Sequence, residues 1–190
     1  MIKNFFAFVL ELLKIVVISL IIIIPVRYFL IQPFYVKGAS MEPNFYDHEY
    51  LIIDEISYRF NEPARGDIIV FRYPKDPQEY FIKRVIGLPG ESVQIKDGKV
   101  YIFNQSNPDG LVLAEDYLSS DLKTYGLNED KVDLNNGEYY VLGDNRNQSK
   151  DSRYFGAVNR SFIIGRVMFR GWPFNRVTVF GTPEYDILVN

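Results

Sequence analysis

The sequence has no cysteine and only one histidine, His48, among its 190 residues. Without cysteine the chain has no disulfide, no thiolate metal site and no cysteine nucleophile, although this absence does not reveal the compartment. His48 lies in the polar stretch 44–49, so we expect it to face solvent, where it would be a poor general base. Any nucleophilic chemistry must therefore use other residues.

Several other classes of function lack their usual signals. The net charge is −3 and no basic patch occurs, which argues against nucleic acid as the main partner. There is no glycine-rich phosphate loop, Asp144, Asp151 and His48 do not have the spacing of zinc ligands, and no carboxylate pair for acid–base work is identifiable. We therefore predict neither a cofactor nor a metal.

The N-terminal segment is a long apolar run. From Phe5 to Val26 it is interrupted by only three polar residues, and its length matches the roughly 20 residues that span a bilayer. A secretory signal peptide is the alternative, but no small-residue cleavage site follows the run. We predict an uncleaved anchor, residues 1–30, with one transmembrane helix at about 6–27. The flanking charges do not predict its orientation.

Beyond residue 30 the sequence is typical of many short strands. Most candidate segments are rich in β-branched and aromatic residues and are bounded by Gly, Pro, Asn or Asp. They cover residues 32–37, 50–56, 67–73, 80–86, 92–95, 99–103, 138–142, 162–169 and 176–180. We predict a mainly β, antiparallel, barrel-like domain over 31–190. Asp97-Gly98 predicts a two-residue hairpin turn of type I′.

A polar, irregular stretch, residues 104–136, separates two of these strand candidates. Within it, residues 118–125 are compatible with one short helix or with none. We interpret the whole stretch as a surface insertion in the β domain.

Ser40 and Lys83 are a candidate nucleophile and base. Ser40 follows the exit of the apolar segment, and Lys83 lies in the apolar strand candidate 80–86. Strand alternation places Lys83 and Arg84 on opposite faces, so one of these cations shares an apolar face. Desolvation lowers the pKa of a lysine and can supply a neutral amine that takes a proton from serine. The alternative, that both cations snorkel from an edge strand, stays open on this pattern alone.

A second segment, 143–156, is dense in polar groups and is bracketed by glycines. It can form a hydrogen-bonded loop against a site, with Asp151 and Arg153 paired and the hydroxyl of Ser149 or Ser152 near a lysine amine. A solvated loop with Asx turns is the alternative. After the exclusions above, serine with lysine is the chemistry that remains.

Four segments together resemble the bacterial type I signal peptidases, membrane-bound Ser/Lys endopeptidases that remove signal peptides from exported preproteins. They are Gly38-Ala39-Ser40-Met41-Glu42-Pro43, Arg65-Gly66-Asp67-Ile68-Ile69-Val70-Phe71, Lys83-Arg84-Val85-Ile86-Gly87-Leu88-Pro89-Gly90, and Gly143-Asp144-Asn145-Arg146 with Asp151-Ser152-Arg153 and Gly156. Each segment alone is weak, but four in the family's order, after a membrane helix, are specific.

The resemblance implies a role for each matching residue. Ser40 is expected to be the nucleophile, with its N–H donating to the oxyanion, and Lys83 the general base. The supporting matches are Ser149, which would orient the lysine amine, the ion pair Asp151 and Arg153, and Asp144, which with Arg146 would fix the loop. The chain departs from some members at Gly38, where they have a serine as a second oxyanion donor.

In this family the substrate binds by β-strand addition, and shallow pockets accept the small residues of an Ala-x-Ala sequence. By position, the pocket residues are Phe34, Val36, Met41, Phe45, Phe81 and Ile82. The stretch 169–174 is interpreted either as an interfacial patch at the bilayer or as core. The insertion 104–136 would be a small cap beside the catalytic barrel.

The resemblance also implies location and partners. We expect a single-pass protein of the bacterial cytoplasmic (inner) membrane, with its catalytic domain on the extracytoplasmic face. Its partners would be the signal peptides of exported preproteins and the lipid bilayer, not nucleic acid, and no oligomeric state is predicted. Two alternatives are less consistent with the sequence. A self-cleaving Ser/Lys repressor would need a DNA-binding segment before the serine, where this chain has an apolar helix candidate, and a silent peptide-binding domain would lack Ser40 or Lys83.

Overall fold

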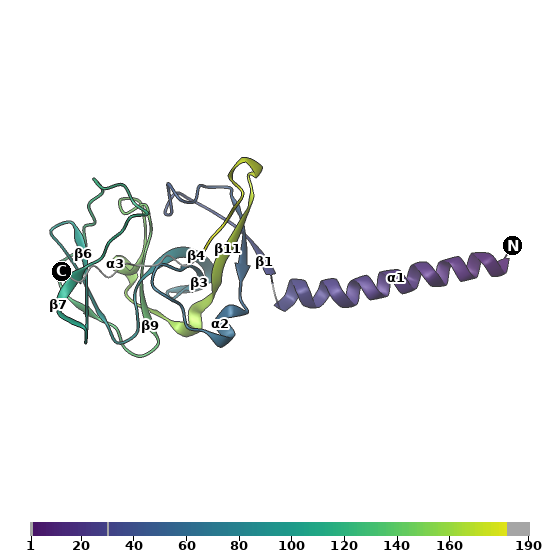
Figure 1. Cartoon of the computed structure of the whole chain (residues 1–190), viewed down its shortest axis with the longest axis horizontal. Helices are drawn as coiled ribbons and strands as arrows, with labels where there is room; N and C mark the ends of the chain where they lie inside the picture. The colour runs from purple at the N-terminus through teal and green to yellow at the C-terminus, as the bar shows by residue number, and fades with distance from the viewer. Residues whose placement is uncertain (1, 30, 182–190) are drawn as a thin grey trace.

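The computed structural model describes residues 2–29 and 31–181. One long helix, α1 (Ile2–Phe29), precedes a domain made mainly of β-strands (Figure 1). All strand pairings in the described part are antiparallel. The predicted fold class, mainly β after one apolar helix, is therefore confirmed.

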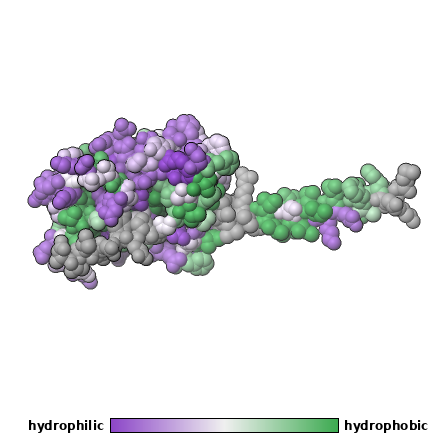
Figure 2. All heavy atoms as spheres, turned by 45° about the horizontal axis from the view of Figure 1, so that its top comes forward, coloured by the Kyte–Doolittle hydropathy of each residue, from purple (hydrophilic) through white to green (hydrophobic). Residues whose placement is uncertain are grey.

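Helix α1 exposes an apolar surface along most of its length. The segment Phe5–Ile24 has a mean hydropathy of 2.8, and none of it is buried against the rest of the protein (Figure 2). At a rise of about 1.5 Å per residue, these 20 residues cover about 30 Å, the thickness of the hydrocarbon core of a bilayer. The helix thus has the length and composition of the predicted membrane span, and it extends a few residues beyond 6–27.

The larger sheet contains the long strands of the domain. In spatial order its strands are β1 (Ile31–Tyr35), β2 (Tyr50–Asp54), β11 (Ile163–Trp172), β3 (Ile68–Tyr73), β4 (Asp76–Gly87), β9 (Glu138–Leu142) and β10 (Val158–Asn159), and β12 (Thr178–Val179) also pairs with β11. The end strands β1 and β10 do not pair with each other within the described residues, so the sheet is barrel-like but open.

A second, smaller sheet forms beside the first one. Its order is β7 (Asn107–Val112), β6 (Lys99–Asn104), β5 (Ser92–Lys96) and β8 (Val132–Asp133). The cap therefore begins earlier than the predicted insertion 104–136, because β5 and β6 belong to it. The hairpin between β5 and β6 is confirmed: Asp97 and Gly98 have φ values of 52° and 77°, as a type I′ turn requires.

The remaining elements are short. They are the helices α2 (Ser57–Phe60) and α3 (Ser152–Phe155) and the 3₁₀ turns η1 (Arg160–Phe162) and η2 (Phe174–Arg176). Residues 118–125 contain turns and no helix, which decides between the two interpretations of that stretch.

Buried side chains divide into three clusters, two in the larger sheet and one between that sheet and the smaller one. One cluster joins β2, β3 and β11 to the segment after β1. It contains Val36, Met41, Phe45, Leu51, Ile53, Ile68, Val70 and Val167. Burying an aliphatic or aromatic side chain of this size contributes roughly 1.5–3 kcal/mol each. This cluster holds the segment around Ser40 against β2 and β3.

Candidate active site

Ser40 lies in the turn that follows β1. Gly38, two residues earlier, has a φ of +84°, which glycine adopts without steric cost, and its N–H donates to Asp47 Oδ1 at 2.9 Å. After Ser40, the N–H of Phe45 donates to the Met41 carbonyl at 2.9 Å. Both of these side chains are fully buried, so they anchor the segment that presents Ser40.

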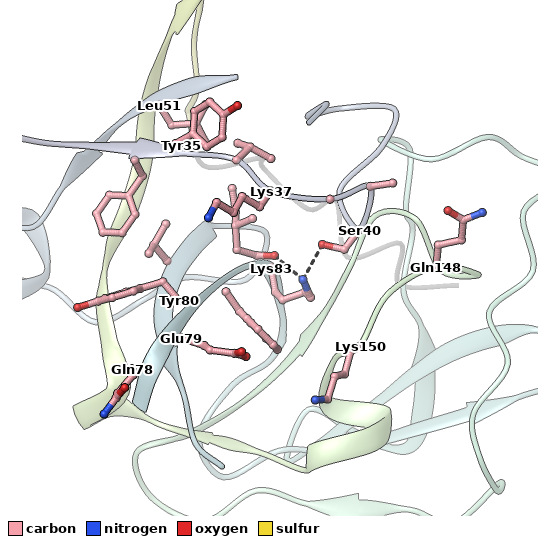
Figure 3. A pocket seen from close by; sticks show the side chains of 17 residues that line it. Tyr35, Lys37, Ser40, Leu51, Gln78, Glu79, Tyr80, Lys83, Gln148 and Lys150 are labelled. Carbon is pink, nitrogen blue, oxygen red and sulfur yellow. Dashed lines mark hydrogen bonds between the residues drawn. The ribbon is translucent and has the colours of Figure 1, made fainter. Parts of the chain in front are cut away.

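Lys83 lies in the middle of β4, opposite Ile69 of β3. Only 3% of the residue is exposed, and its amine nitrogen lies 2.7 Å from Ser40 Oγ (Figure 3). The same amine donates to the Ile82 carbonyl at 2.8 Å, and it lies 5.3 Å from the centre of the Phe81 ring. The two residues singled out in the sequence, 43 positions apart, therefore meet in hydrogen-bonding contact, and Lys83 does not snorkel.

Burial lowers the pKa of the Lys83 amine from 10.5 to about 8. Desolvation is the main cause, because a buried ammonium loses its hydration. The negative charges of Asp151 and Asp144 oppose it and raise the pKa. The net result is an amine that is partly neutral near pH 8 and can accept a proton.

The polar segment 143–156 packs into the protein and does not form a solvated loop. Asp144 is fully buried and accepts from both Arg84 Nε at 2.8 Å and Arg84 Nη2 at 2.7 Å. Arg84 therefore pairs with the loop from the strand position next to Lys83. Asn44, from the Ser40 segment, also donates to Asp144 at 2.8 Å, so one carboxylate joins three parts of the site.

The predicted pair of Asp151 and Arg153 is present. Arg153 Nε and Nη2 each donate to Asp151 at 2.8 Å, and the buried carboxylate also accepts the N–H of Gly143 at 3.0 Å. The neighbouring Ser152 hydroxyl accepts the N–H of Val141 at 2.9 Å. Ser152 thus fastens the loop to β9 and is not directed at the lysine.

Ser149 is buried, but its hydroxyl makes no hydrogen bond in the described part of the chain. The hydrogen bond to Lys83 that the resemblance implied is therefore not formed in this structure. The hydroxyl does lie close to the segment of Ser40, because a Cβ built on Gly143 would approach Ser149 Oγ to 2.1 Å and the Ser40 carbonyl to 2.4 Å. Only glycine permits this approach.

A cavity of about 670 Å³ opens beside Ser40 and Lys83. Four of the predicted pocket residues line it: Phe34, Val36, Phe81 and Ile82. Leu51 and Val70 add apolar surface, whereas Lys37, Glu79, Gln148 and Lys150 add polar groups (Figure 3). A largely apolar cavity with a few polar groups is typical of a ligand or substrate site.

Two pocket predictions are wrong. Met41 and Phe45 are 1% and 0% exposed and do not line the cavity. They belong to the core instead, where the Phe45 ring lies 4.7 Å from that of Phe180. The prediction for His48 is correct, since its side chain is 73% exposed and pairs with Asp47 at the surface.

Several residues of the site were missed in the sequence. Asn145 donates from its backbone to the Ser40 carbonyl at 3.1 Å and from its side chain to the Ala39 carbonyl at 3.0 Å. Glu115 and Tyr117, from the cap, contact Arg146 of the loop. The only available signal for Asn145 was its place in a family motif, and the two cap residues lie in a stretch without any pattern.

Within the described residues, no three His, Cys, Asp or Glu side chains form a group that could hold a metal ion.

Comparison with known proteins agrees with this geometry. The family model described as signal peptidase, peptidase S26, matches residues 9–172. The chain belongs to the signal peptidase family, peptidase family S26. The predicted recognition is thereby confirmed, and the protein is a hydrolase of the serine endopeptidase class.

Individual relatives cover most of the chain. A signal peptidase I of Leptolyngbya laminosa is 41% identical over 90% of this chain and 83% of its own length. A probable signal peptidase I-2 of Synechocystis is 40% identical over 88% and 75%, and a signal peptidase IB of Staphylococcus aureus is 32% identical over 89% and 92%. A solved signal peptidase I from Enterococcus faecalis is 36% identical, with a TM-score of 0.46, over 56% of this chain and 97% of that chain.

As a type I signal peptidase, the protein removes signal peptides, and its substrates are preproteins that carry them. Members of this group are anchored in a membrane, and α1 fits that role.

Proposed function

We propose that the protein cleaves preproteins after small residues, in an Ala-x-Ala context, with Ser40 as nucleophile and Lys83 as general base. The observation that carries this proposal is the 2.7 Å contact between Lys83 Nζ and Ser40 Oγ. A general base must lie within hydrogen-bonding distance of the proton that it removes and needs a pKa near the working pH. Lys83 meets both conditions, since burial lowers its pKa to about 8.

The chemistry proceeds in two steps. Neutral Lys83 takes the Ser40 proton while Oγ attacks the scissile carbonyl carbon, and the ammonium then protonates the leaving amine as the C–N bond breaks. In the second step, Lys83 takes a proton from water, the hydroxide attacks the acyl-enzyme ester, and the proton returns to Ser40 Oγ. The Ser40 N–H donates to no acceptor within the described residues, which leaves it available for the oxyanion.

Ser149 and the two buried ion pairs support this dyad. The Ser149 hydroxyl is buried beside Gly143 and lacks a partner; we assign it the role of holding the lysine amine during the reaction. The pairs of Asp144 with Arg84 and of Asp151 with Arg153 fix the loop in place. Breaking a buried pair usually costs about 3–5 kcal/mol, so these residues hold their geometry firmly.

We assign the preference for small side chains to an extended peptide that would lie between two segments of the cavity wall. The segment after β1 and the outer half of β4 form its walls, with Val36 and Ile82 close to the dyad. A substrate strand that enters between these walls would point alternate side chains toward Leu51 and Val70 at the base. Alternate positions with small residues correspond to Ala-x-Ala.

The domain organisation follows the same proposal. Residues 1–30 anchor a catalytic domain, 31–190, on the extracytoplasmic face of the cytoplasmic membrane. The stretch 169–174 would rest on the bilayer, because Trp172 and Phe174 are 47% and 77% exposed and their rings contact at 4.7 Å. The last nine residues, 182–190, lie outside the described part of the chain.

The test is a cleavage assay with detergent-solubilised full-length protein and a preprotein that carries Ala-x-Ala. The mass of the products should show cleavage after the second alanine by the wild type, and none by Ser40→Ala or Lys83→Ala. Near-wild-type cleavage by either variant would refute the dyad. Orientation is tested separately with Lys96→Cys, at an exposed position. Because the chain has no other cysteine, a membrane-impermeant maleimide should label this variant in spheroplasts if the catalytic domain is extracytoplasmic.

A further inference from the structure

A buried polar cluster connects the cap to the catalytic loop. It contains Glu115, Tyr117 and Thr124, which we call the cap latch, and its partner in the loop is Arg146. Only 1% of the Arg146 side chain and 14% of the Glu115 side chain are exposed. A charged group this deeply buried must be paired, so the cap and the loop depend on each other at this point.

The contacts of Arg146 use most of its donors. Nη1 and Nη2 donate to the two carboxylate oxygens of Glu115, the first at 2.9 Å, and Nη1 also donates to Thr124 Oγ1. The Tyr117 hydroxyl donates to Glu115 at 2.6 Å and thereby orients the carboxylate. Burial opposes the charge of the guanidinium, but the hydrogen bonds and charge of Glu115 outweigh this and raise the pKa of Arg146. Arg146 therefore stays a cation.

From Arg146 the contacts lead to the nucleophile. Its Nε donates to the Gly143 carbonyl at 3.0 Å, and its own carbonyl accepts from Arg153 at 2.7 Å. Gly143 packs directly against the Ser40 carbonyl, and Asn145, between Gly143 and Arg146, donates to that same carbonyl. A displacement of Arg146 is thus passed to the backbone of Ser40.

A second path leads to the base. The Tyr117 carbonyl accepts from Asn44 at 3.2 Å, and Asn44 also donates to Asp144. The centre of the Tyr117 ring lies 3.9 Å from the guanidinium carbon of Arg84. Arg84 is next in sequence to Lys83. The cap latch therefore touches both the segment of the nucleophile and the strand of the base.

We infer that Glu115 and Tyr117 are positioning residues for the reaction of Ser40 with Lys83, acting through Arg146, Asn44 and Arg84. This inference rests on the proposed dyad. Misplacement of reacting groups by about 1 Å can cost up to about 100-fold in rate. Because neither residue lines the substrate cavity, the loss falls on kcat and not on KM.

The experiment compares Glu115→Gln and Tyr117→Phe with Glu91→Gln in the full-length protein. Glu91 is a matched control: it is also buried, also accepts two hydrogen bonds from an arginine, Arg65, and also joins the cap to the large sheet, but it has no contact with the loop. We expect kcat to fall about 10- to 100-fold for Glu115→Gln, with KM within about twofold. Glu115→Asp, which keeps the charge, should recover most of the loss.

Tm and the circular dichroism spectrum are measured for every variant, and kcat is compared at a temperature below the Tm of each. The inference is overturned if folded Glu115→Gln and Tyr117→Phe keep the wild-type kcat, or if Glu91→Gln loses as much kcat as Glu115→Gln. Ser40→Ala run alongside separates the two proposals. If Ser40→Ala is inactive and Glu115→Gln is fully active, only the role of the cap latch is refuted. If Ser40→Ala is active, both the dyad and the role of the cap latch are refuted.

Discussion

The pH dependence of cleavage follows from the environment of Lys83. With a pKa of about 8, the amine is neutral in about one tenth of the molecules at pH 7, in half at pH 8 and in about nine tenths at pH 9. Since only the neutral amine accepts the Ser40 proton, kcat/KM should rise about tenfold from pH 7 to pH 9. Below pH 7 it should fall about tenfold for each pH unit.

The assay measures kcat/KM on an internally quenched Ala-x-Ala peptide in detergent from pH 6 to pH 10, with circular dichroism at each pH. A variant that changes the burial of the amine sharpens the test. Phe81 lies 5.3 Å from Lys83 Nζ, so Phe81→Ala should admit water, reduce desolvation and move the midpoint upward toward 10.5.

Two results would refute this reasoning. A midpoint near 10 in the wild type would mean that Lys83 is not desolvated when it reacts. A midpoint between pH 4 and 6, unaffected by Phe81→Ala, would assign the base to a carboxylate. Either result would contradict the assignment of Lys83 as a buried general base.

Three further predictions concern stability and the membrane. Lys83→Met should abolish cleavage and raise the free energy of unfolding at pH 7 by up to about 3 kcal/mol, measured by urea denaturation. The reason is that the lysine of the wild type binds its proton more tightly in the unfolded chain than in the folded one. The gain in stability is full below pH 8 and disappears as the pH rises through 10.5. Asp151→Ala should lower the free energy of unfolding by about 3–5 kcal/mol, since it leaves buried Arg153 without its partner. Trp172 is the only tryptophan, so brominated lipids in vesicles should quench its fluorescence if the stretch 169–174 contacts the bilayer. Unchanged fluorescence would place this stretch in water.

Several strands around the site were predictable because their patterns are local. The apolar runs of β4 and β9 and the Asp97-Gly98 turn each contain their own signal, and the structure has all three, although β4 begins at Asp76, before the predicted range 80–86. Strand β7, residues 107–112, was missed because it contains Pro108, Asp109 and Gly110, residues that are typical of turns. Its strand form depends on pairing with β6, which no local pattern reveals.

The pairing of Ser40 with Lys83 was predicted by elimination together with the resemblance to the signal peptidases, because the local pattern alone left it open. Strand alternation left open whether Lys83 or Arg84 faces an apolar environment. The structure shows that both are buried, at 3% exposure each, but their surroundings differ in charge. Arg84 has the carboxylate of Asp144, whereas Lys83 has no ion pair within the described residues and therefore loses charge. The sequence does not state which cation has a partner, because the partner lies 60 residues away.

The predicted pocket failed at Met41 and Phe45 for a related reason. Both were assigned by their positions in the family resemblance, but in the folded chain their side chains are buried in the core. The role of the cap was missed altogether, because Glu115 and Tyr117 are polar residues in an irregular stretch. Their meaning comes only from Arg146 and Arg84, which reach them in the folded chain.

The buried ion pairs also explain how a lysine can serve as base so close to two carboxylates. An unpaired carboxylate near Lys83 would stabilise the ammonium and raise its pKa, which would silence the base at neutral pH. Here Asp144 is paired with Arg84 and Asp151 with Arg153, so each negative charge is met by a positive one before it acts on the amine. Desolvation then outweighs the remaining attraction, and the pKa of Lys83 falls to about 8. The arginines thus hold the loop in place and, on the proposed mechanism, leave Lys83 able to act as the base.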